Sequence, residues 1–313
     1  MNGISFSQPE PGGFRQLPDE APLEMSVQRL EGNPPGSIEV ETAPRDLLAK
    51  RLLLLVAAGL LGMAGSTAQR LAMSRDGLDW LEIVFLLLFV PLLCWIAFGF
   101  VSSFIGFISL MSGAHPGFTA ITGSADRVRQ RTAVLMPVYN EEVSTVFGRV
   151  EAMAASIAQA GMTGLVDFFV LSDSRPDHGE EELAAWRRVA AAAPIPVYYR
   201  RRAENIARKP GNIAEWLQRF GSAYEYMIIL DADSMMSGNS ILGLTTIMEQ
   251  RPSIGLLQTV PMTINARTLF QRWQQFAGYA YGPIASAGLL WWSGAEANFW
   301  GHNAIVRVRA FAE

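Results

Sequence analysis

The sequence predicts an α/β domain with a Rossmann-like, mostly parallel sheet, preceded by two transmembrane helices and a disordered amino-terminal tail. Short β-type runs alternate with helical patterns from Thr132 onward, which is typical of parallel strands joined by crossover helices. Two long stretches before that point carry no charge. Half of the 313 residues are hydrophobic and 17% are charged, whereas an average soluble protein has roughly 25% charged residues. This composition favours a membrane protein.

Residues 1–47 are predicted to form a disordered cytoplasmic tail. Residues 1–44 contain seven of the 17 prolines and hardly an apolar cluster, so they bury too little surface to offset the entropy of ordering. A basic start followed by an apolar core is missing, which argues against a cleaved signal peptide. A regulatory or partner-docking arm is the functional alternative.

The uncharged stretches predict transmembrane helices at 48–70 and 83–108, joined by a short periplasmic loop at 71–82. A helix of about 20 apolar residues crosses a hydrocarbon layer of about 30 Å. The second stretch, from Ile83 to Ala114, is longer than one crossing needs. A tilt or a kink near Pro91 is therefore expected.

Basic residues near the ends of the spans predict the orientation, because Lys and Arg are retained on the cytoplasmic side. Three basic residues lie at the start of the first span: Arg45, Lys50 and Arg51. Three follow the second span: Arg127, Arg129 and Arg131. The loop between the spans has two: Arg70 and Arg75. Both ends are thus expected to face the cytoplasm. The prediction is a multi-pass protein of the bacterial inner membrane with a cytoplasmic catalytic domain at 126–313.

Net charge and cysteine content exclude several classes of protein. A formal charge of −4 gives no general drive toward nucleic acid, whose binding rests on neutralising phosphates. Cys94 is the only cysteine, so disulfide frameworks and cysteine-based metal sites are excluded. A metal ion would have to be held by oxygen atoms or by a few imidazoles.

The predicted strands place the candidate site at one edge of the sheet. Five β-type runs are recognisable: 133–138, 166–171, 195–199, 226–230 and 254–260. In open α/β sheets, ligands bind beyond the carboxyl ends of the strands. The residues that follow the first, second and fourth runs are polar or acidic: Tyr139, Asn140 and Glu141; Asp173; Asp231 and Asp233.

Asp231 and Asp233 are the predicted metal ligands. If the backbone stays extended there, both side chains leave the same face and approach one hard cation, Mg²⁺ or Mn²⁺. Such ions bind through one or two carboxylates together with substrate phosphate oxygens, which implies a nucleoside diphosphate substrate. No phosphate-binding loop of the G-x-x-x-x-G-K-[ST] type and no G-x-G-x-x-G follows the first strand.

An ordered set of motifs resembles the membrane-embedded, inverting family-two glycosyltransferases, relatives of cellulose and hyaluronan synthases. The set is Pro137-Val138-Tyr139-Asn140-Glu141, Asp173, Lys209-Pro210-Gly211-Asn212, Asp231-Ala232-Asp233 and Gln258-Thr259-Val260-Pro261. The runs 172–177 and 299–307 are similar to the glucosyltransferases that build the backbone of osmoregulated periplasmic glucans. The resemblance covers about residues 45–313 and implies a nucleotide-diphospho-sugar transferase (GT-A) fold.

The resemblance also implies a role for each matching residue. Tyr139 and Glu141 would lie by the uracil and ribose of UDP-glucose, with Asp173 fixing the base, and Pro137, Gly211 and Asn212 belong to the same donor site. Lys209 would face the diphosphate. Asp231 and Asp233 would hold the metal, so that the charge of the leaving diphosphate is stabilised. Trp300, His302 and Asn303 would line the acceptor sugar.

The implied activity is the inverting transfer of glucose from UDP-glucose to a growing β-glucan. The implied partners are the glucan acceptor, membrane lipid, acyl carrier protein and periplasmic glucan-modifying proteins. Two alternatives stay open: another processive polysaccharide synthase of the cellulose or hyaluronan kind, and a UDP-sugar-binding regulatory module without turnover. The family's acceptor-activating aspartate is expected beyond Glu313, so we expect this fragment to bind donor better than it turns it over.

Several conspicuous residues have plainer interpretations. The basic run Arg200-Arg201-Arg202 is expected to be a solvated turn, with phosphate contact as the alternative. Glu180-Glu181-Glu182 is expected to begin a helix, where negative charge suits the helix dipole. Trp300 and His302 could also be core residues, and Trp291-Trp292 could pack in a core or rest at a membrane interface.

Overall fold

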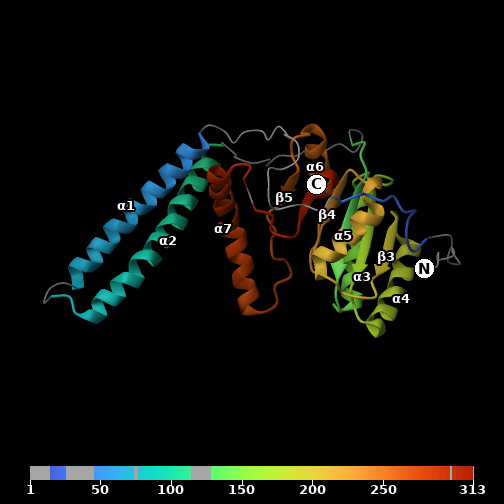
Figure 1. Cartoon of the computed structure of the whole chain (residues 1–313), viewed down its shortest axis with the longest axis horizontal. Helices are drawn as coiled ribbons and strands as arrows, with labels where there is room; N and C mark the ends of the chain where they lie inside the picture. Colours follow the sequence, from blue (N-terminus) through green and yellow to red (C-terminus); the bar gives the residue numbers. More distant parts are fainter. Residues whose placement is uncertain (1–14, 26–45, 74–76, 114–127, 297, 313) are drawn as a thin grey trace. The chain divides into compact units, whose positions relative to one another are not determined.

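The computed structural model describes residues 15–25, 46–73, 77–113, 128–296 and 298–312 (Figure 1). The chain divides into two compact units. One unit comprises residues 1–36, 121–259 and 299–313, and the other comprises residues 37–120 and 260–298. Residues 260–298, which belong to the predicted catalytic domain at 126–313, cluster with the amino-terminal helices.

The helical unit contains α1 (Leu47–Met73), α2 (Trp80–Met111) and α7 (Leu269–Ser293). Helices α1 and α2 lie side by side (Figure 1). By length and composition both are apolar enough to cross a membrane. Each contains one of the spans predicted at 48–70 and 83–108. The side chain of Asp79 caps α2 in a capping box with Glu82, which fixes where the second helix begins.

Helix α7 packs against α2 through two glycines. A Cβ atom on Gly288 would lie 2.1 Å from the carbonyl oxygen of Ser102, and one on Gly106 would lie 2.1 Å from that of Ile284. Small residues of this kind let two helix backbones approach closely. Trp292 donates from its indole nitrogen to the hydroxyl of Ser102 at 3.2 Å. Trp292 thus packs within the helical unit, and its position at a membrane interface stays a prediction.

The other unit is built on a six-stranded sheet in the order β3-β2-β1-β4-β6-β5. Its strands are β1 (Thr132–Val138), β2 (Val166–Ser172), β3 (Val197–Arg201), β4 (Tyr226–Ile229), β5 (Leu256–Gln258) and β6 (Ala304–Arg307). The pairings β1–β2, β2–β3 and β1–β4 are parallel. Strand β6, which the sequence analysis did not predict, runs antiparallel to β4 and β5.

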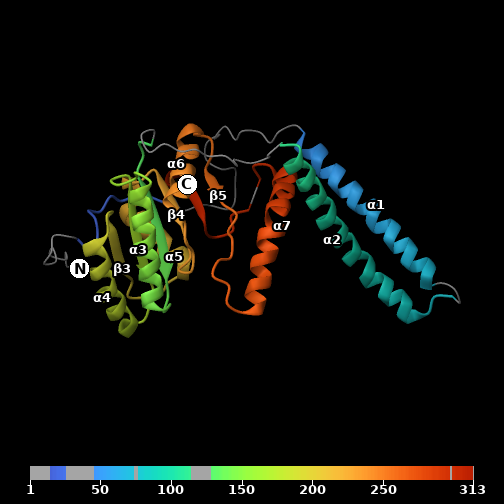
Figure 2. The ribbon, with the colours of Figure 1, turned by 180° about the vertical axis from the view of Figure 1, so that it is seen from behind.

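Helices cover both faces of the sheet, as expected for a Rossmann-like domain (Figure 2). They are α3 (Val143–Gln159), α4 (Pro176–Ala192), α5 (Arg208–Phe220) and α6 (Gly238–Gln250), with a short 3-10 helix, η2 (Gly221–Ala223), after α5 and a terminal helix, α8 (Val308–Ala312). Strand side chains alternate between the two faces. Val134 and Met136 of β1 pack in the core with α3, α4 and α6, whereas Ala133 and Leu135 pack on the α5 side.

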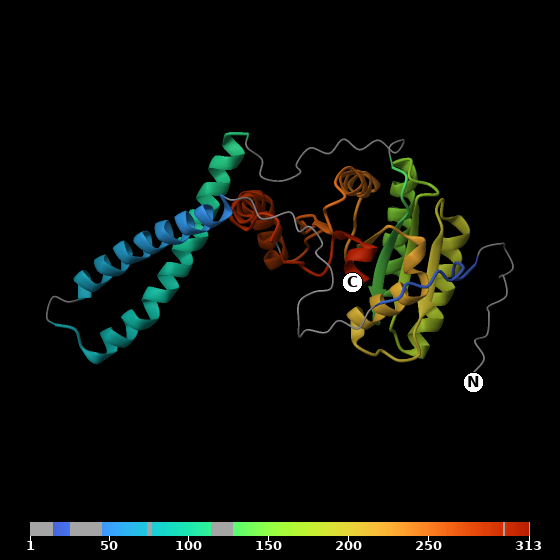
Figure 3. The ribbon, with the colours of Figure 1, turned by 45° about the horizontal axis from the view of Figure 1, so that its top comes forward.

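Residues 15–25 contradict the predicted disordered tail. The amide of Ala21 donates to the carbonyl of Arg219 at 2.8 Å, and the amide of Tyr199 donates to the carbonyl of Gln16 at 3.1 Å. Leu17, Leu23 and Met25 pack on the core of the α5 side, so tertiary contacts supply the apolar burial that the segment lacks by itself. Figure 3 shows this segment, in blue, running past α5. The rest of the predicted tail lies outside the described residues.

Candidate functional site

The predicted site residues of the sheet unit lie at the carboxyl ends of the central parallel strands. Strand β1 leads to Tyr139 and Glu141, and β2 leads to Asp173. Strand β4 is followed by Leu230 and then by Asp231. This is the edge at which open parallel sheets bind ligands.

The loop after β1 is held in a defined conformation that leaves Tyr139 accessible. Its side chain is 53% exposed, and its backbone amide donates to the Glu141 carboxylate. Asn140 has a φ of 60°, in the left-handed region. The Asn140 amide donates to the hydroxyl of Ser174 at 2.8 Å, and its side-chain oxygen accepts from the amide of Arg175 at 3.1 Å. The loops after β1 and β2 are thus locked together.

Asp173 forms a buried, bidentate ion pair with Arg202. Nε of Arg202 donates to Oδ1 at 2.6 Å, and Nη2 donates to Oδ2 at 2.8 Å. The side chains of Arg202 and Asp173 are 7% and 5% exposed. Arg202 is therefore not part of a solvated turn, and its guanidinium is engaged within the protein and does not face open solvent.

Lys209 lies in the first turn of α5, where it meets the predicted metal site. Its ammonium group donates to a carboxylate oxygen of Asp231 and to the carbonyl of Gly301 at 2.8 Å. Pro210 follows at a first-turn position, where a backbone N–H would have no partner within the helix, so the proline fits without loss. Ala207, the residue before α5, provides no side-chain cap.

Two consecutive residues before Lys209 adopt the left-handed conformation. Ala207 has a φ of 54° and Arg208 a φ of 50°, a region that costs an L-residue roughly 1–2 kcal/mol. Gly211 packs beneath them, because a Cβ atom there would lie 2.2 Å from the carbonyl oxygen of Ile206. The glycine of the Lys-Pro-Gly-Asn motif thus allows a close backbone approach.

Asn212 is fully buried and bonds inward. Its side-chain nitrogen donates to the carbonyl of Leu171 at 3.0 Å, and its side-chain oxygen accepts from Arg200. Arg200 is 4% exposed and also pairs with Glu215 at 3.0 Å, so it too departs from the expected solvated turn. Burial lowers the pKa of Arg200 to about 10. In the structure, Asn212 joins α5 to β2 and β3.

Asp231 and Asp233 are accessible, but the backbone between them is not extended. The amide of Ser234 donates to the carbonyl of Asp231 at 2.9 Å, and Ala232 and Asp233 form a turn. The condition for the same-face argument is therefore not met, and the chain turns back toward α6. The Asp231 side chain is 40% exposed and Asp233 is exposed, so neither carboxylate is sealed in the interior.

The segment before β6 contains the three predicted acceptor residues, and one of them, His302, lies beside Asp231. Trp300 is 43% exposed, which excludes the core interpretation for this side chain. Nδ1 of His302 lies 3.9 Å from Oδ2 of Asp231 and, among the described residues, has no hydrogen-bond partner. Asn303 is 8% exposed with a φ of 52°, and its amide donates to the carbonyl of Ile229 at 2.8 Å. Its backbone thus ties this segment to β4.

The sequence analysis missed three hydrogen bonds that support these loops. The hydroxyl of Ser174 donates to Glu182 at 2.6 Å, and the hydroxyl of Tyr199 donates to the same carboxylate at 2.9 Å. Glu182 is 3% exposed, and α4 begins at Pro176, so the run Glu180-Glu181-Glu182 does not begin the helix as expected. Arg149 of α3 donates to the carbonyl of Ala232 at 2.8 Å, which supports the turn between the two aspartates. Only the spacing of Glu182 along α4 could have indicated its inward side.

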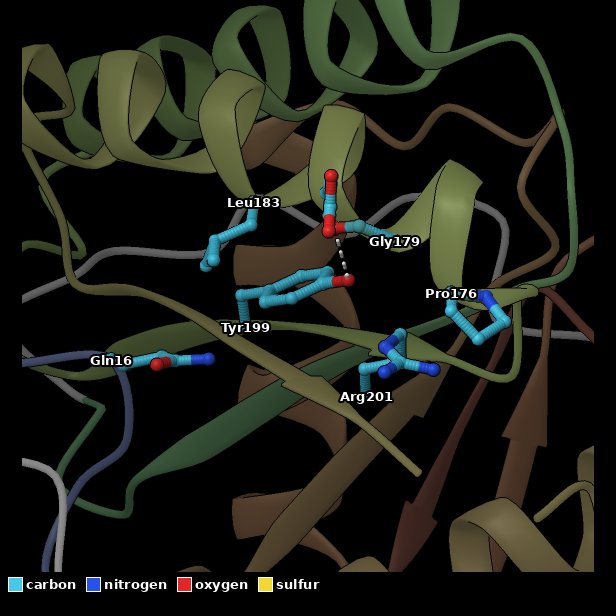
Figure 4. A pocket seen from close by; sticks show the side chains of 7 residues that line it. Gln16, Pro176, Gly179, Leu183, Tyr199 and Arg201 are labelled. Carbon is cyan, nitrogen blue, oxygen red and sulfur yellow. Dashed lines mark hydrogen bonds between the residues drawn. The ribbon is translucent and has the colours of Figure 1, made fainter. Parts of the chain in front are cut away.

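A pocket of about 310 Å³ lies between α4 and β3, the edge strand of the sheet. Its lining residues are Gln16, Pro176, Gly179, Glu180, Leu183, Tyr199 and Arg201 (Figure 4). In it, the Tyr199 hydroxyl lies 3.4 Å from the carbonyl of Gly179. None of these residues belongs to the predicted donor, metal or acceptor set.

The carboxylates near Asp231 can hold a hard divalent cation only if a bound substrate supplies further oxygen ligands. Among the described residues, no group of three or more His, Cys, Asp and Glu side chains could hold a metal ion by itself. Mg²⁺ and Mn²⁺ accept one or two carboxylates together with phosphate oxygens. The exposed carboxylate of Asp233 and the partly exposed carboxylate of Asp231 meet that requirement.

The Rossmann-like sheet of this unit is the fold of a glycosyltransferase domain, and comparison with known families agrees. The model of the family described as Glycosyl transferase family 2 matches residues 133–313, and the chain belongs to this family. The predicted fold class and the predicted family are thus confirmed. A solved mannosyltransferase, PcManGT from Pyrobaculum calidifontis in complex with GDP-Man and Mn²⁺, matches with a TM-score of 0.41 and 15% identity over 66% of this chain and 56% of that one.

Curated relatives extend the similarity to the helical unit. The glucans biosynthesis glucosyltransferase H of Caulobacter vibrioides is 44% identical over 95% of this chain and 45% of its own length. The protein of the same name from Bradyrhizobium diazoefficiens is 44% identical over 95% and 40%, and that of Xanthomonas euvesicatoria is 40% identical over 96% and 47%. The chain therefore spans less than half the length of these relatives.

Proposed function

We propose that the chain is the donor-binding part of a membrane glucosyltransferase that transfers glucose from UDP-glucose, with inversion, to a growing β-glucan. The observation that carries the proposal is the meeting of Lys209, Asp231 and the Gly301 carbonyl at the carboxyl end of β4. A lysine paired with a half-exposed carboxylate provides the charges that bind a diphosphate and its metal ion. The similarity to enzymes named for glucan biosynthesis supports glucose as the sugar.

The proposed diphosphate site combines Lys209 with the start of α5. The first amides of a helix have no partners within the helix, and the helix dipole places partial positive charge there. Ala207 supplies no side-chain cap, so the amides of Arg208 and Lys209 can bind an anion, whereas Pro210 has no N–H to donate. On binding the donor, Lys209 would exchange part of its contact with Asp231 for phosphate oxygens.

The proposed metal ligands are Asp233 and Asp231, and the ion is Mg²⁺ or Mn²⁺. When bound, the ion would neutralise the charge that develops on the leaving diphosphate. Tyr139, Glu141 and Asp173 are proposed to flank the uridine. Trp300, with 43% of its surface exposed, offers a face on which the acceptor sugar stacks, and His302 lies beside it at the Asp231 carboxylate.

The proposed membrane position rests on α1 and α2, with the site on the cytoplasmic side. Basic residues at both ends of this helix pair support that orientation. Reporter enzymes fused to the carboxyl end would test the orientation. We expect a reporter that is active only in the cytoplasm to be active in this fusion, and a reporter that is active only in the periplasm to be inactive.

Donor selectivity tests the proposed function. We expect the detergent-solubilised chain to bind UDP-glucose in the presence of Mn²⁺ at least tenfold more tightly than GDP-mannose, measured by calorimetry. Preference for GDP-mannose would refute the assignment of the donor. Release of UDP that depends on added glucan would establish transfer.

A further inference from the structure

Arg202, at the end of β3, joins two loops that the proposed donor site requires. On one side its guanidinium forms the bidentate pair with Asp173. On the other side, Nη1 donates to the carbonyl of Ile206 at 3.1 Å and Nη2 donates to that of Arg208 at 3.2 Å. Because the guanidinium is a planar fork with five donors, it serves both sides at once, and a lysine ammonium does not.

The two carbonyls that Arg202 binds enclose the strained part of the loop. Ala207 and Arg208 both adopt the left-handed conformation and neither is glycine. Such residues persist only where the surrounding structure holds them. The described structure shows no side-chain cap at Ala207 that would do so. The bonds from Arg202 to the carbonyls on either side of Ala207 therefore fix this turn.

The residue that follows the strained turn is Lys209. Its direction depends on the backbone of Arg208, and its ammonium must reach both the Asp231 carboxylate and the Gly301 carbonyl. A change in the turn would swing the lysine away from both. The Asp173 side chain, buried after β2, is the fixed point from which this arrangement is built.

We propose that Arg202 is the positioning residue for Lys209: anchored on Asp173, it holds the strained turn that aims the lysine at the diphosphate of the donor. The inference rests on the proposed function and adds a residue to it. Arg202 needs no contact with the donor in this role. Its hydrogen bonds connect the loop that contains Asp173 to the turn that precedes Lys209.

The first test is UDP binding in the presence of Mn²⁺ by calorimetry on the solubilised chain. Arg202→Lys keeps the positive charge but removes the forked guanidinium. We expect the affinity for UDP to fall about tenfold, which is the lower end of the loss seen when a residue that orients a metal ligand is replaced. The matched control is Arg201→Lys, because Arg201 is the neighbouring arginine with an exposed side chain. The control is expected to stay within about twofold of the unchanged protein.

A double-mutant cycle separates positioning from a general structural role. If Arg202 acts through Lys209, Arg202→Lys will cause little further loss of UDP affinity in a Lys209→Gln background. A purely structural effect would cause the same fold-loss in both backgrounds, and that result would overturn the inference. Absence of UDP binding by the unchanged protein would instead overturn the proposed function.

A rescue experiment covers the case in which Arg202→Lys is poorly folded. Glycine adopts positive φ without strain, so Ala207→Gly should relieve the need for the arginine. In the Arg202→Lys background, we expect Ala207→Gly to raise the affinity for UDP severalfold. In the protein with no other change, we expect Ala207→Gly to alter the affinity for UDP by less than about twofold. Failure to restore binding would show that the strained turn is not what Arg202 supports.

Discussion

Replacing Asn212 by alanine distinguishes an inward structural role from direct contact with the donor. The change removes the side-chain hydrogen bond that Asn212 donates to the buried Leu171 carbonyl, and an ordinary hydrogen bond contributes about 0.5–1.5 kcal/mol. It also removes a charge-assisted bond from Arg200, which typically contributes about 1.5–3 kcal/mol. Arg200 retains Glu215 at 3.0 Å and the Asn212 carbonyl at 3.0 Å. We therefore expect the free energy of unfolding to fall by about 3 kcal/mol.

Thermal unfolding of the sheet unit, followed by tryptophan fluorescence in detergent, measures this loss. For a unit of this size, 3 kcal/mol corresponds to a decrease in Tm of roughly 6–12 °C. Gln218→Ala, on an exposed position of the same helix, is the matched control and is expected to change Tm little. An unchanged Tm together with lost UDP affinity would refute the reasoning, because Asn212 would then face the donor.

Three further predictions concern contacts within the sheet unit and within the helical unit. The carbonyl of Glu141 raises the pKa of His178 above 6.5, with acidic neighbours adding to the effect. The protonated His178 side chain therefore stabilises the fold fully below pH 6.5, and this stabilisation is lost as the pH rises through the raised pKa. In thermal unfolding, His178→Gln should lower Tm at pH 6 and lower it much less at pH 9. An equal decrease in Tm at both pH values would contradict this prediction. Leu23→Ala should lower the stability of the sheet unit by about 1–2 kcal/mol in the same assay, because the side chain is only partly buried; no change would mean that residues 15–25 do not dock. Gly288→Ala should destabilise the helical unit by about 1–3 kcal/mol, whereas Gly278→Ala, where nothing lies within 4 Å of the new Cβ atom, should not; similar Tm values for both variants would argue against the close approach of α2 and α7.

The basic run at 200–202 shows what sequence alone can and cannot predict. Three consecutive arginines resemble a solvated turn by composition. In a strand, however, alternate residues share a face, so Arg200 and Arg202 point to one side and the exposed Arg201 to the other. This alternation was available in the sequence. Their partners, Asn212, Glu215 and Asp173, depend on how the strands and α5 assemble, which no local pattern indicates.

Other differences follow from the same distinction between local and tertiary signals. Strands β1, β2 and β4 were predictable because their apolar runs are buried on both faces. Strand β6 has only four residues and follows an irregular segment, so its local signal is weak. Residues 15–25 acquire order from the surface they bind. The motif residues Tyr139, Lys209 and Asp231 were found because their chemistry, at the ends of predicted strands, is readable from the sequence.

The central claim is that Asp231 and Asp233 bind UDP-glucose through a divalent cation. Calorimetric titration of UDP-glucose in Mn²⁺ and in EDTA tests it most directly, with Asp233→Asn compared with Glu151→Gln, an exposed acidic residue of α3. We expect Mn²⁺ to increase the affinity at least tenfold in the unchanged protein and in Glu151→Gln, and to have no effect in Asp233→Asn. Equal affinity with and without Mn²⁺, or the same Mn²⁺ response in Asp233→Asn, would contradict the claim.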